Sequence, residues 1–174
     1  MTILYLLLAI IVLVLVIAAF IGTAWTIERS IDINASASKV WGNVGTLRAL
    51  NGWNPWSSKD PNVKLTFKGQ DGAVGSSYDW DSTDKNVGAG TQTILSTDAP
   101  RELQTRVDFL RPFKGTGNAW LKLNEANGKT TVSWGMASST PYPMNIIKLF
   151  GVIEKNMDKA FTEGLGELKR RSEA

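Results

Sequence analysis

The sequence predicts an α+β protein in which an antiparallel β-sheet curls around one long C-terminal helix, preceded by a single transmembrane helix. Three observations predict this arrangement. Residues 3–21 are all apolar. Residues 63–136 contain short segments in which apolar and polar side chains alternate, as in strands with one face in water. From Met144 to about Arg170, apolar residues recur every three or four positions, which is the period of an amphipathic helix.

The composition excludes several classes of chemistry. The 174 residues include no Cys and no His. Disulfides, thiolate catalysis, Ser-His-Asp triads and metal sites built from Cys or His are therefore excluded, and we expect neither a metal nor a cofactor. The formal net charge is only +3, and the basic residues are mixed with acidic ones rather than gathered in a stripe. We therefore expect no nucleic-acid partner.

The N-terminal apolar run is long enough to cross a bilayer. As a helix, the segment from Ile3 to Ile21 would span roughly 28 Å, close to the thickness of the hydrocarbon core. A cleaved signal peptide is the alternative, because Gly22 and Ala24 are small residues of the kind found at cleavage sites. The run exceeds the usual ~7–15 apolar residues of a signal peptide, and no Lys or Arg precedes it. We expect residues 1–24 to form a membrane anchor and residues 25–174 to form one domain.

The basic residues bear on how the domain would face the membrane. Arg29, Lys39 and Arg48 follow the apolar run, whereas no Lys or Arg precedes it. This contrast favours a cytoplasmic domain on a single-pass protein, although a folded domain can be translocated despite so small a bias. The basic triplet at 169–171 has two interpretations. It suits the negative end of a final helix, or it contacts anionic lipid headgroups if that end lies near the membrane.

The domain is expected to begin with a strand and short helices. In residues 25–34, isoleucines alternate with polar side chains, which predicts a first strand directly after the apolar run. A short helix should follow from residue 35, with Ser36 as its N-cap. Residues 51–56 contain Gly and Pro and predict a turn that carries two tryptophans.

The strands that follow are separated by turn residues. Clear alternation predicts strands over residues 63–67, 78–80, 103–109, 119–123 and 132–136, with a weaker strand over residues 87–98. The Asn127-Gly128 pair predicts a tight hairpin between the last two strands. A Pro-Tyr-Pro segment at 141–143 precedes the C-terminal helix, which at roughly 40 Å is long enough to cross the whole sheet.

This order of elements predicts a cavity. The sheet can bury its apolar face only by curling around the last helix, and outward-bowed strands would leave space for a small apolar ligand. Five segments also carry a family resemblance: Ile-Glu-Arg-Ser-Ile-Asp-Ile-Asn-Ala (27–35), Trp-Asn-Pro-Trp (53–56), Gly-Ala-Val-Gly-Ser-Ser-Tyr-Asp-Trp (72–80), Thr-Thr-Val-Ser-Trp-Gly-Met (130–136) and Gly-Leu-Gly-Glu-Leu-Lys (164–169).

On these segments, residues 26–169 resemble the SRPBCC superfamily (START/Bet v 1-like), particularly bacterial polyketide cyclase/dehydrase-like proteins. The resemblance implies the helix-grip (START-like) fold and a hydrophobic pocket. It implies roles that range from lipid or hydrophobe binding to polyketide ring closure. The bacterial relatives also imply that the membrane is the bacterial inner membrane.

The candidate ligand-binding residues are aromatic and polar side chains at inward-facing positions. Two indoles in the predicted turn could rim an entrance, or cap one end of the fold as structural residues. The remaining aromatics could equally be core side chains, whereas buried polar groups could orient a ligand. The full set is Trp53, Trp56, Tyr78, Trp80, Gln92, Thr105, Phe109, Trp134 and Met136.

The predicted function is a membrane-anchored binding domain for a hydrophobic small molecule or lipid. A polyketide cyclase- or dehydratase-like enzyme is an alternative, for which only carboxylates, Lys, Arg or Tyr could act as acid or base. We expect no catalytic residue, since the acidic and basic candidates lie at outward-facing strand positions: Asp79, Asp81, Arg106 and Asp108. A membrane-tethered protein-interaction module is a further alternative, although nothing in the sequence names a protein partner.

Overall fold

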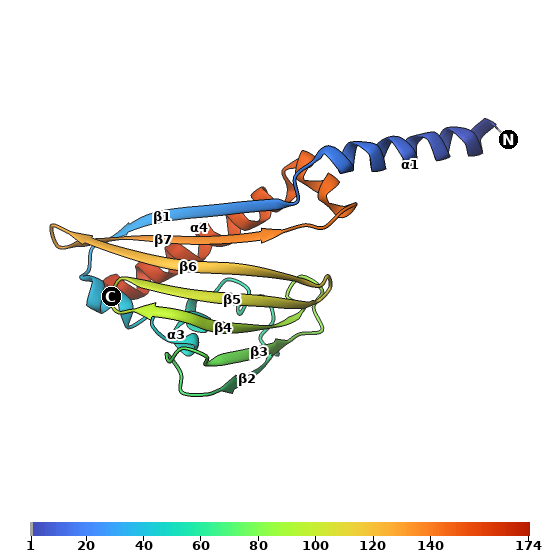
Figure 1. The fold of residues 1–174 in the computed structure, drawn as a ribbon. Coiled ribbons are helices and arrows are strands. Elements are labelled where there is room, and N and C mark those ends of the chain that lie inside the picture. Colours follow the sequence, from blue (N-terminus) through green and yellow to red (C-terminus); the bar gives the residue numbers. More distant parts are fainter. Residues whose placement is uncertain (1) are drawn as a thin grey trace.

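The computed structural model describes residues 2–174 and contains one seven-stranded antiparallel sheet. Helix α1 (Thr2–Phe20) projects away from the sheet, and all other elements pack together (Figure 1). With a mean hydropathy of 3.3, α1 is long and apolar enough to cross a membrane, as a signal sequence also would be. The other elements are β1 (Ala24–Ile33), α2 (Ala37–Trp41), α3 (Leu47–Trp53), β2 (Lys64–Lys68), β3 (Ser77–Asp81), β4 (Ala89–Asp98), β5 (Glu102–Arg111), β6 (Gly115–Ala126), β7 (Lys129–Ser139), η1 (Met144–Phe150) and α4 (Val152–Glu173).

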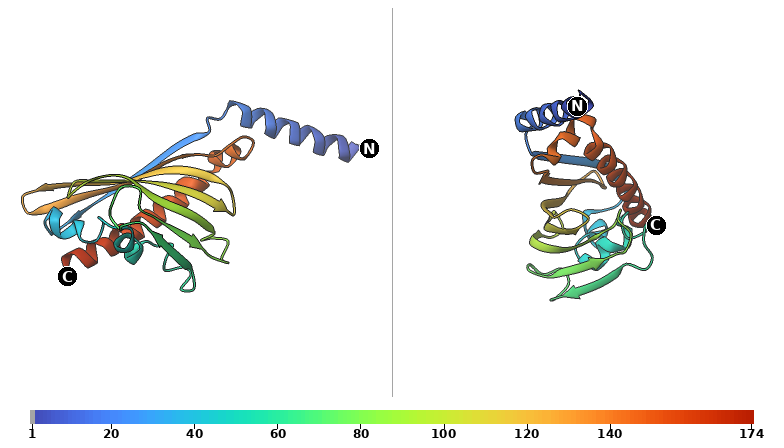
Figure 2. Two further views of the ribbon diagram at one scale, coloured as in Figure 1. Left: turned by 60° about the horizontal axis from the view of Figure 1, so that its bottom comes forward. Right: turned by 90° about the vertical axis from the view of Figure 1, so that its right-hand side faces the viewer.

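The sheet has the order β1-β7-β6-β5-β4-β3-β2 and curves around α4 (Figure 2). The predicted helix-grip fold is thus confirmed. The Asn127-Gly128 turn joins β6 to β7 with φ angles of 53° and 73°, as the sequence predicts. Ser36 caps α2 by accepting a hydrogen bond from the Lys39 amide, which is also as predicted.

The inner face of the sheet forms the core with the short helices and α4. Near the C-terminal end of α4, Leu165 and Leu168 pack with strand and helix residues such as Ile33, Val40 and Leu47, all almost fully buried. A second group surrounds Phe161 and lies closer to the start of α4. Residues of both groups line the cavity described below.

The C-terminal helical segment differs from the prediction of one helix over residues 144–170. It consists of the 3-10 helix η1 and the α-helix α4, separated by Gly151. Gly151 has a φ of +61°, a left-handed conformation that glycine adopts without strain and that ends η1. The break was hidden in the sequence because the apolar pattern continues across it.

The region around Trp53 also differs from the predicted turn. Residues 47–53 form helix α3, which is capped by Thr46 and ends at Trp53. Trp53 is 3% exposed, so it is a buried helical residue. Gly52 has a low helix propensity, and Pro55 follows soon after the helix. Burial of Leu47, Leu50 and Trp53 on one helix face outweighs this low propensity.

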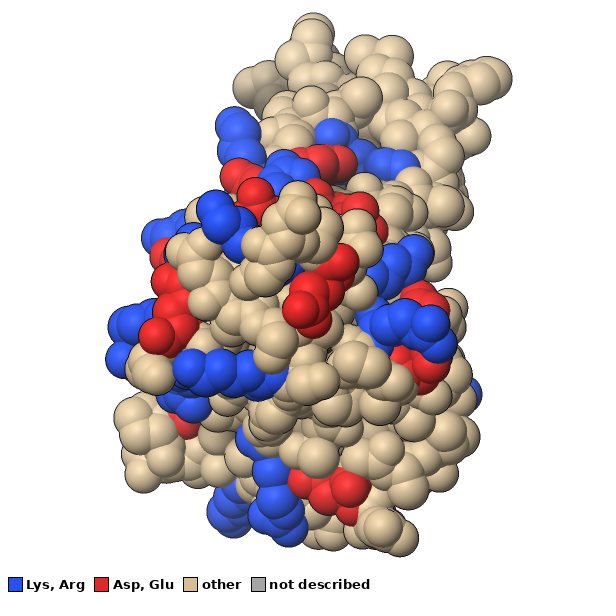
Figure 3. All heavy atoms as spheres, turned by 90° about the vertical axis from the view of Figure 1, so that its left-hand side faces the viewer, with Lys and Arg blue, Asp and Glu red and all other residues tan. Residues whose placement is uncertain are grey.

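The basic triplet lies at the end of the molecule opposite α1 (Figure 1). Helix α4 starts beside η1 and extends about 33 Å over its 22 residues. Arg170 and Arg171 both bind Glu167, and Lys169 donates to the Asp32 carbonyl. Figure 3 shows Lys and Arg mixed with Asp and Glu at this end of the molecule. These contacts agree with the interpretation of the triplet as a helix-end cluster, and the triplet lies far along α4 from the segment that would cross a membrane.

Candidate functional site

A cavity of about 260 Å³ lies between the inner face of the sheet and helices α3 and α4. This volume is near the lower limit for small-molecule pockets. All nine candidate residues from the sequence line it: Trp53, Trp56, Tyr78, Trp80, Gln92, Thr105, Phe109, Trp134 and Met136. They come from α3 and the residues that follow it and from strands β3, β4, β5 and β7. The alternation of side chains along each strand is what directs them to one face.

One wall of the cavity is a cluster of four aromatic rings. Trp134 of β7 stacks on Phe161 of α4, with ring centroids 4.2 Å apart. Trp53 and Trp56 meet Trp134 edge-on, at centroid distances of 5.0 Å and 6.1 Å. Offset-stacked and edge-on arrangements are those that aromatic rings prefer. The cluster thus joins α3, α4 and β7 into a rigid apolar wall.

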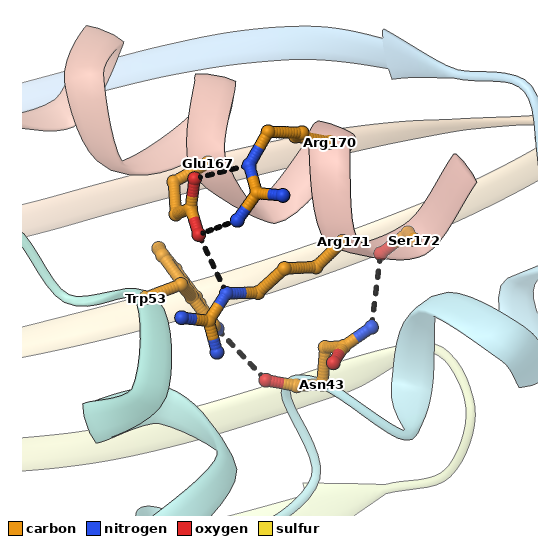
Figure 4. Close-up of polar contacts among 6 residues, drawn as sticks. All are labelled: Asn43, Trp53, Glu167, Arg170, Arg171 and Ser172. Atoms are coloured by element: carbon orange, nitrogen blue, oxygen red, sulfur yellow. Dashed lines mark hydrogen bonds and ion pairs between the residues drawn. The ribbon is translucent and has the colours of Figure 1, made fainter. Parts of the chain in front are cut away.

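Trp53 serves this wall and also fixes α3 in place. Its Nε1 donates to the Asn43 carbonyl at 2.8 Å, and the Asn43 side chain donates to Ser172 Oγ at 3.1 Å (Figure 4). The hydrogen bonds therefore connect α3 to the end of α4. Since its N–H group is already bonded, Trp53 contributes apolar surface to the cavity rather than a free donor.

The opposite wall is a second row of aromatic side chains on β3 and β5. The Tyr78 ring lies 6.0 Å from Trp80, which lies 6.0 Å from Phe109. Trp80 Nε1 donates to the Val87 carbonyl at 3.1 Å, which fastens the β3–β4 loop to the cavity edge. Gly90 makes room for this indole, because a Cβ atom there would lie 2.3 Å from the Trp80 ring.

A short chain of polar groups crosses the apolar cavity. The Tyr78 hydroxyl donates to Gln92 Oε1 at 3.0 Å, and Gln92 Nε2 donates to Thr105 Oγ1 at 2.9 Å. These residues lie on the neighbouring strands β3, β4 and β5. Within residues 2–174 the Thr105 side chain makes no other hydrogen bond, so its hydroxyl proton remains available to a ligand.

Tyr78 is neutral under physiological conditions. Burial raises the pKa of its hydroxyl to about 12, and the nearby Asn51 side chain only partly opposes this shift. Desolvation disfavours the phenolate because the charged form loses its hydration in the apolar surroundings. Tyr78 therefore acts as a hydrogen-bond donor and is a poor proton donor or acceptor for chemistry near neutral pH.

The four charged residues considered for catalysis face outward and form ion pairs. Asp79 binds Lys68 at 2.6 Å and accepts a hydrogen bond from Thr91, and these contacts lower the pKa of its carboxyl group. Arg106 pairs with Asp108 at 2.9 Å. Asp81 pairs with Arg111, whose side chain also reaches the cavity edge. Among the described residues that line the cavity, none is Asp or Glu.

Several cavity residues were not among the sequence candidates. Asn51 and Leu50 come from α3, which the sequence assigned to a turn from residue 51. Four others could have been found from their sequence period: Leu103 and Val107 alternate with outward residues on β5, and Met157 and Phe161 are one helical turn apart on α4.

Comparison with known proteins identifies the family. The sequence profile of a family described as polyketide cyclase / dehydrase and lipid transport matches residues 24–173, which is almost everything outside α1. The chain belongs to this family. The resemblance to the SRPBCC superfamily is thereby confirmed. No curated protein matches the chain.

Solved structures share the fold of this polyketide cyclase/dehydrase family member at low identity. Protein Mll3558 from Rhizobium loti aligns with a TM-score of 0.64 and 10% identity, over 85% of this chain and 96% of its own. A protein from Thermobifida fusca gives 0.61 and 23%, over 84% and 92%. The structure of Ara h 8.0201 gives 0.56 and 12%, over 83% and 97%. At these identities the likeness concerns the fold alone.

Proposed function

We propose that this protein binds a hydrophobic small molecule or lipid in the sheet–helix cavity while α1 holds the domain to a membrane. The observation that carries the proposal is a cavity of about 260 Å³ whose walls are mostly aromatic and aliphatic and include all nine candidate residues. Apolar walls with a few placed polar groups are typical of small-molecule sites. The family description, which includes lipid transport, supports the same role.

The polar chain in the cavity suggests the chemistry of the ligand. The free Thr105 hydroxyl proton is a donor surrounded by apolar side chains. A buried donor without a partner is costly, so a ligand that supplies an acceptor would be favoured over a pure hydrocarbon. The proposed ligand is therefore an apolar molecule with a carbonyl, ether or hydroxyl oxygen that reaches Thr105.

Contacts between α1 and the domain support a retained anchor rather than a cleaved signal peptide. Asn145 of η1 is 1% exposed and donates from Nδ2 to the carbonyls of Ala18 and Ile21 at 2.8 Å and 2.7 Å. Cleavage after Ala24 would remove both acceptors. We therefore propose that residues 1–24 remain attached as a single membrane span and that residues 25–174 form the binding domain, on the cytoplasmic side of the bacterial inner membrane.

Catalysis is the less favoured alternative. Ring closure or dehydration needs an acid or base near the substrate. The titratable side chains that line the cavity are Tyr78, with its raised pKa, and Arg111, which is paired with Asp81. The raised pKa makes Tyr78 unsuited to proton transfer near neutral pH, and Arg111 is engaged in its ion pair, so binding agrees better with the site than a reaction does.

Native mass spectrometry of the full chain in mild detergent would test the binding proposal. The protein should carry a hydrophobic molecule, and Ala119→Phe should lose it because Ala119 lines the cavity and a phenylalanine side chain there would fill the space of the ligand. Ala137→Phe is the matched control, since Ala137 lies beside Met136 in β7 and faces the other side of the sheet. Equal ligand occupancy in both folded variants would refute binding in this cavity.

A further inference from the structure

An exposed apolar surface surrounds the 3-10 helix η1. Residues 141–153 contain one charged residue, Lys148. Five large apolar side chains in this stretch are exposed to solvent, and we call them the η1 surface: Tyr142 (52% exposed), Met144 (41%), Leu149 (61%), Phe150 (69%) and Val152 (44%). Soluble domains rarely expose such a contiguous group without a partner.

Polar contacts hold the η1 surface at the C-terminal end of α1. Asn145 bonds the Ala18 and Ile21 carbonyls, and Lys148 Nζ donates to the carbonyls of Gly22 and Ala24, both at 2.6 Å. The ammonium group of Lys148, the one charge of residues 141–153, is thus bound by backbone carbonyls just after the end of α1. Phe20, the last residue of α1, is 87% exposed in the same region.

The strand register places further exposed apolar residues at this end of the sheet. Ala24 pairs with Ser139, Gly117 with Ser138, and Phe109 with Gly115, so the β5–β6 hairpin lies at the end where α1 joins β1. In and beside this hairpin, Leu110 is 55% and Phe113 is 69% exposed. On the opposite end of the molecule, Lys and Arg side chains lie among Asp and Glu (Figure 3).

We propose that the η1 surface inserts into the interfacial region of the bilayer that α1 spans. The occupant is a lipid surface because the η1 surface continues directly from the apolar helix α1, and its aromatic and aliphatic composition is that of interfacial segments. The proposal rests on the membrane span in the proposed function. It places the domain against the bilayer, so that the β5–β6 hairpin and the cavity edge at Val87 and Arg111 face the lipid.

Fluorescent labelling of single cysteines tests this proposal, since the natural chain has no Cys. The full chain would be reconstituted into phosphatidylcholine/phosphatidylglycerol vesicles with an NBD label at Leu149→Cys or Phe150→Cys. Leu95→Cys is the matched control, an exposed leucine (41%) on β4. Ile10→Cys, in the middle of α1, reports on the span itself.

At positions 149 and 150 we expect blue-shifted emission, quenching by nitroxide-labelled lipids and protection from iodide. The label at position 95 should show the opposite behaviour. If the label at position 10 is in lipid while those at 149 and 150 behave like position 95, the η1 proposal is overturned and the anchor remains. If the label at position 10 is also exposed to water, the anchor and the η1 proposal both fail. Two labelled positions in η1 guard against one substitution that perturbs the segment.

Discussion

The indole of Trp134 lies parallel to the ring of Phe161, with an interplanar angle of 13° and a centroid distance of 4.2 Å. This pair joins the strand β7 to the helix α4 in the middle of the domain. Trp53 and Trp56 rest against the same indole from α3 and from the segment that follows it. The wall of the cavity and the packing of the last helix therefore depend on the same rings.

Phe161→Ala should lower the free energy of unfolding by about 3–5 kcal/mol, because Phe161 is 1% exposed and its removal leaves a hole beside Trp134. Urea unfolding of the full chain in detergent, followed by tryptophan fluorescence, would measure this. Leu95→Ala, at an exposed site, should change stability by less than about 0.5 kcal/mol. Equal effects of the two substitutions would show that the stacked pair does not support the fold.

Two glycines of α4 should respond in opposite directions to alanine. A Cβ atom at Gly164 would lie 2.7 Å from the Trp134 ring and 3.0 Å from Pro55, whereas one at Gly166 would meet nothing within 4 Å. Gly166→Ala should raise stability by about 0.5–1 kcal/mol through helix propensity alone. Gly164→Ala should lower stability, because Trp134 has to move. Thermal unfolding of both variants provides the comparison, and a gain at both sites would contradict the close packing.

Stability should fall at alkaline pH because of Tyr78. Its pKa is raised from 10.0 to about 12 in the folded state, so folding favours the protonated form. The shift adds about 2–3 kcal/mol to the free energy of unfolding. This contribution is fully present below pH 10 and is lost as the pH rises through 12. Unfolding measured across this range should show the fall, and Tyr78→Phe should lack this part of it. An identical pH dependence in the variant would mean that Tyr78 titrates normally.

Thr105→Val should cost about 1–3 kcal/mol of stability, since it leaves the Gln92 amide without its acceptor in a mostly apolar cavity. It should also weaken binding of an oxygen-containing ligand more than of a hydrocarbon. Thr93→Val is the control on β4, where Thr93 pairs with the outward-facing Arg106. Chemical unfolding and ligand titration would distinguish the two variants, and loss of binding to both ligand types alike would argue against the donor role.

The intact mass of the protein isolated from membranes should include residues 2–24. Retention is expected because the carbonyls of Ala18 and Ile21 accept both hydrogen bonds from the Nδ2 group of the buried Asn145. Asn145→Leu removes this contact at similar size and should increase proteolysis after residue 20, whereas Asn124→Leu, at an exposed position of β6, should not. A mature chain that begins at residue 25 would identify α1 as a signal peptide.

The structural features that repeat with a short period along the sequence were the ones predicted best. One face of each strand contacts water, so alternation identified the strands and directed residues such as Tyr78 and Thr105 inward. Their hydrogen-bonded chain could not be predicted, because it depends on the register that sets Tyr78 opposite Gln92. The contact between Asn145 and Ala18 joins residues 127 positions apart, and an Asn within an apolar stretch gives no local sign of such a partner.

The connection between α1 and β1 limits where the domain can go. Helix α1 ends at Phe20 and β1 begins at Ala24, and the intervening residues extend at most about 10 Å. Lys148 further binds the carbonyls of Gly22, within this connection, and of Ala24, at the start of β1. A domain on so short a tether cannot reach across to a second membrane. With α1 anchored as proposed, the domain would take up and release its ligand within reach of one lipid surface, as a local reservoir or presenter rather than a shuttle.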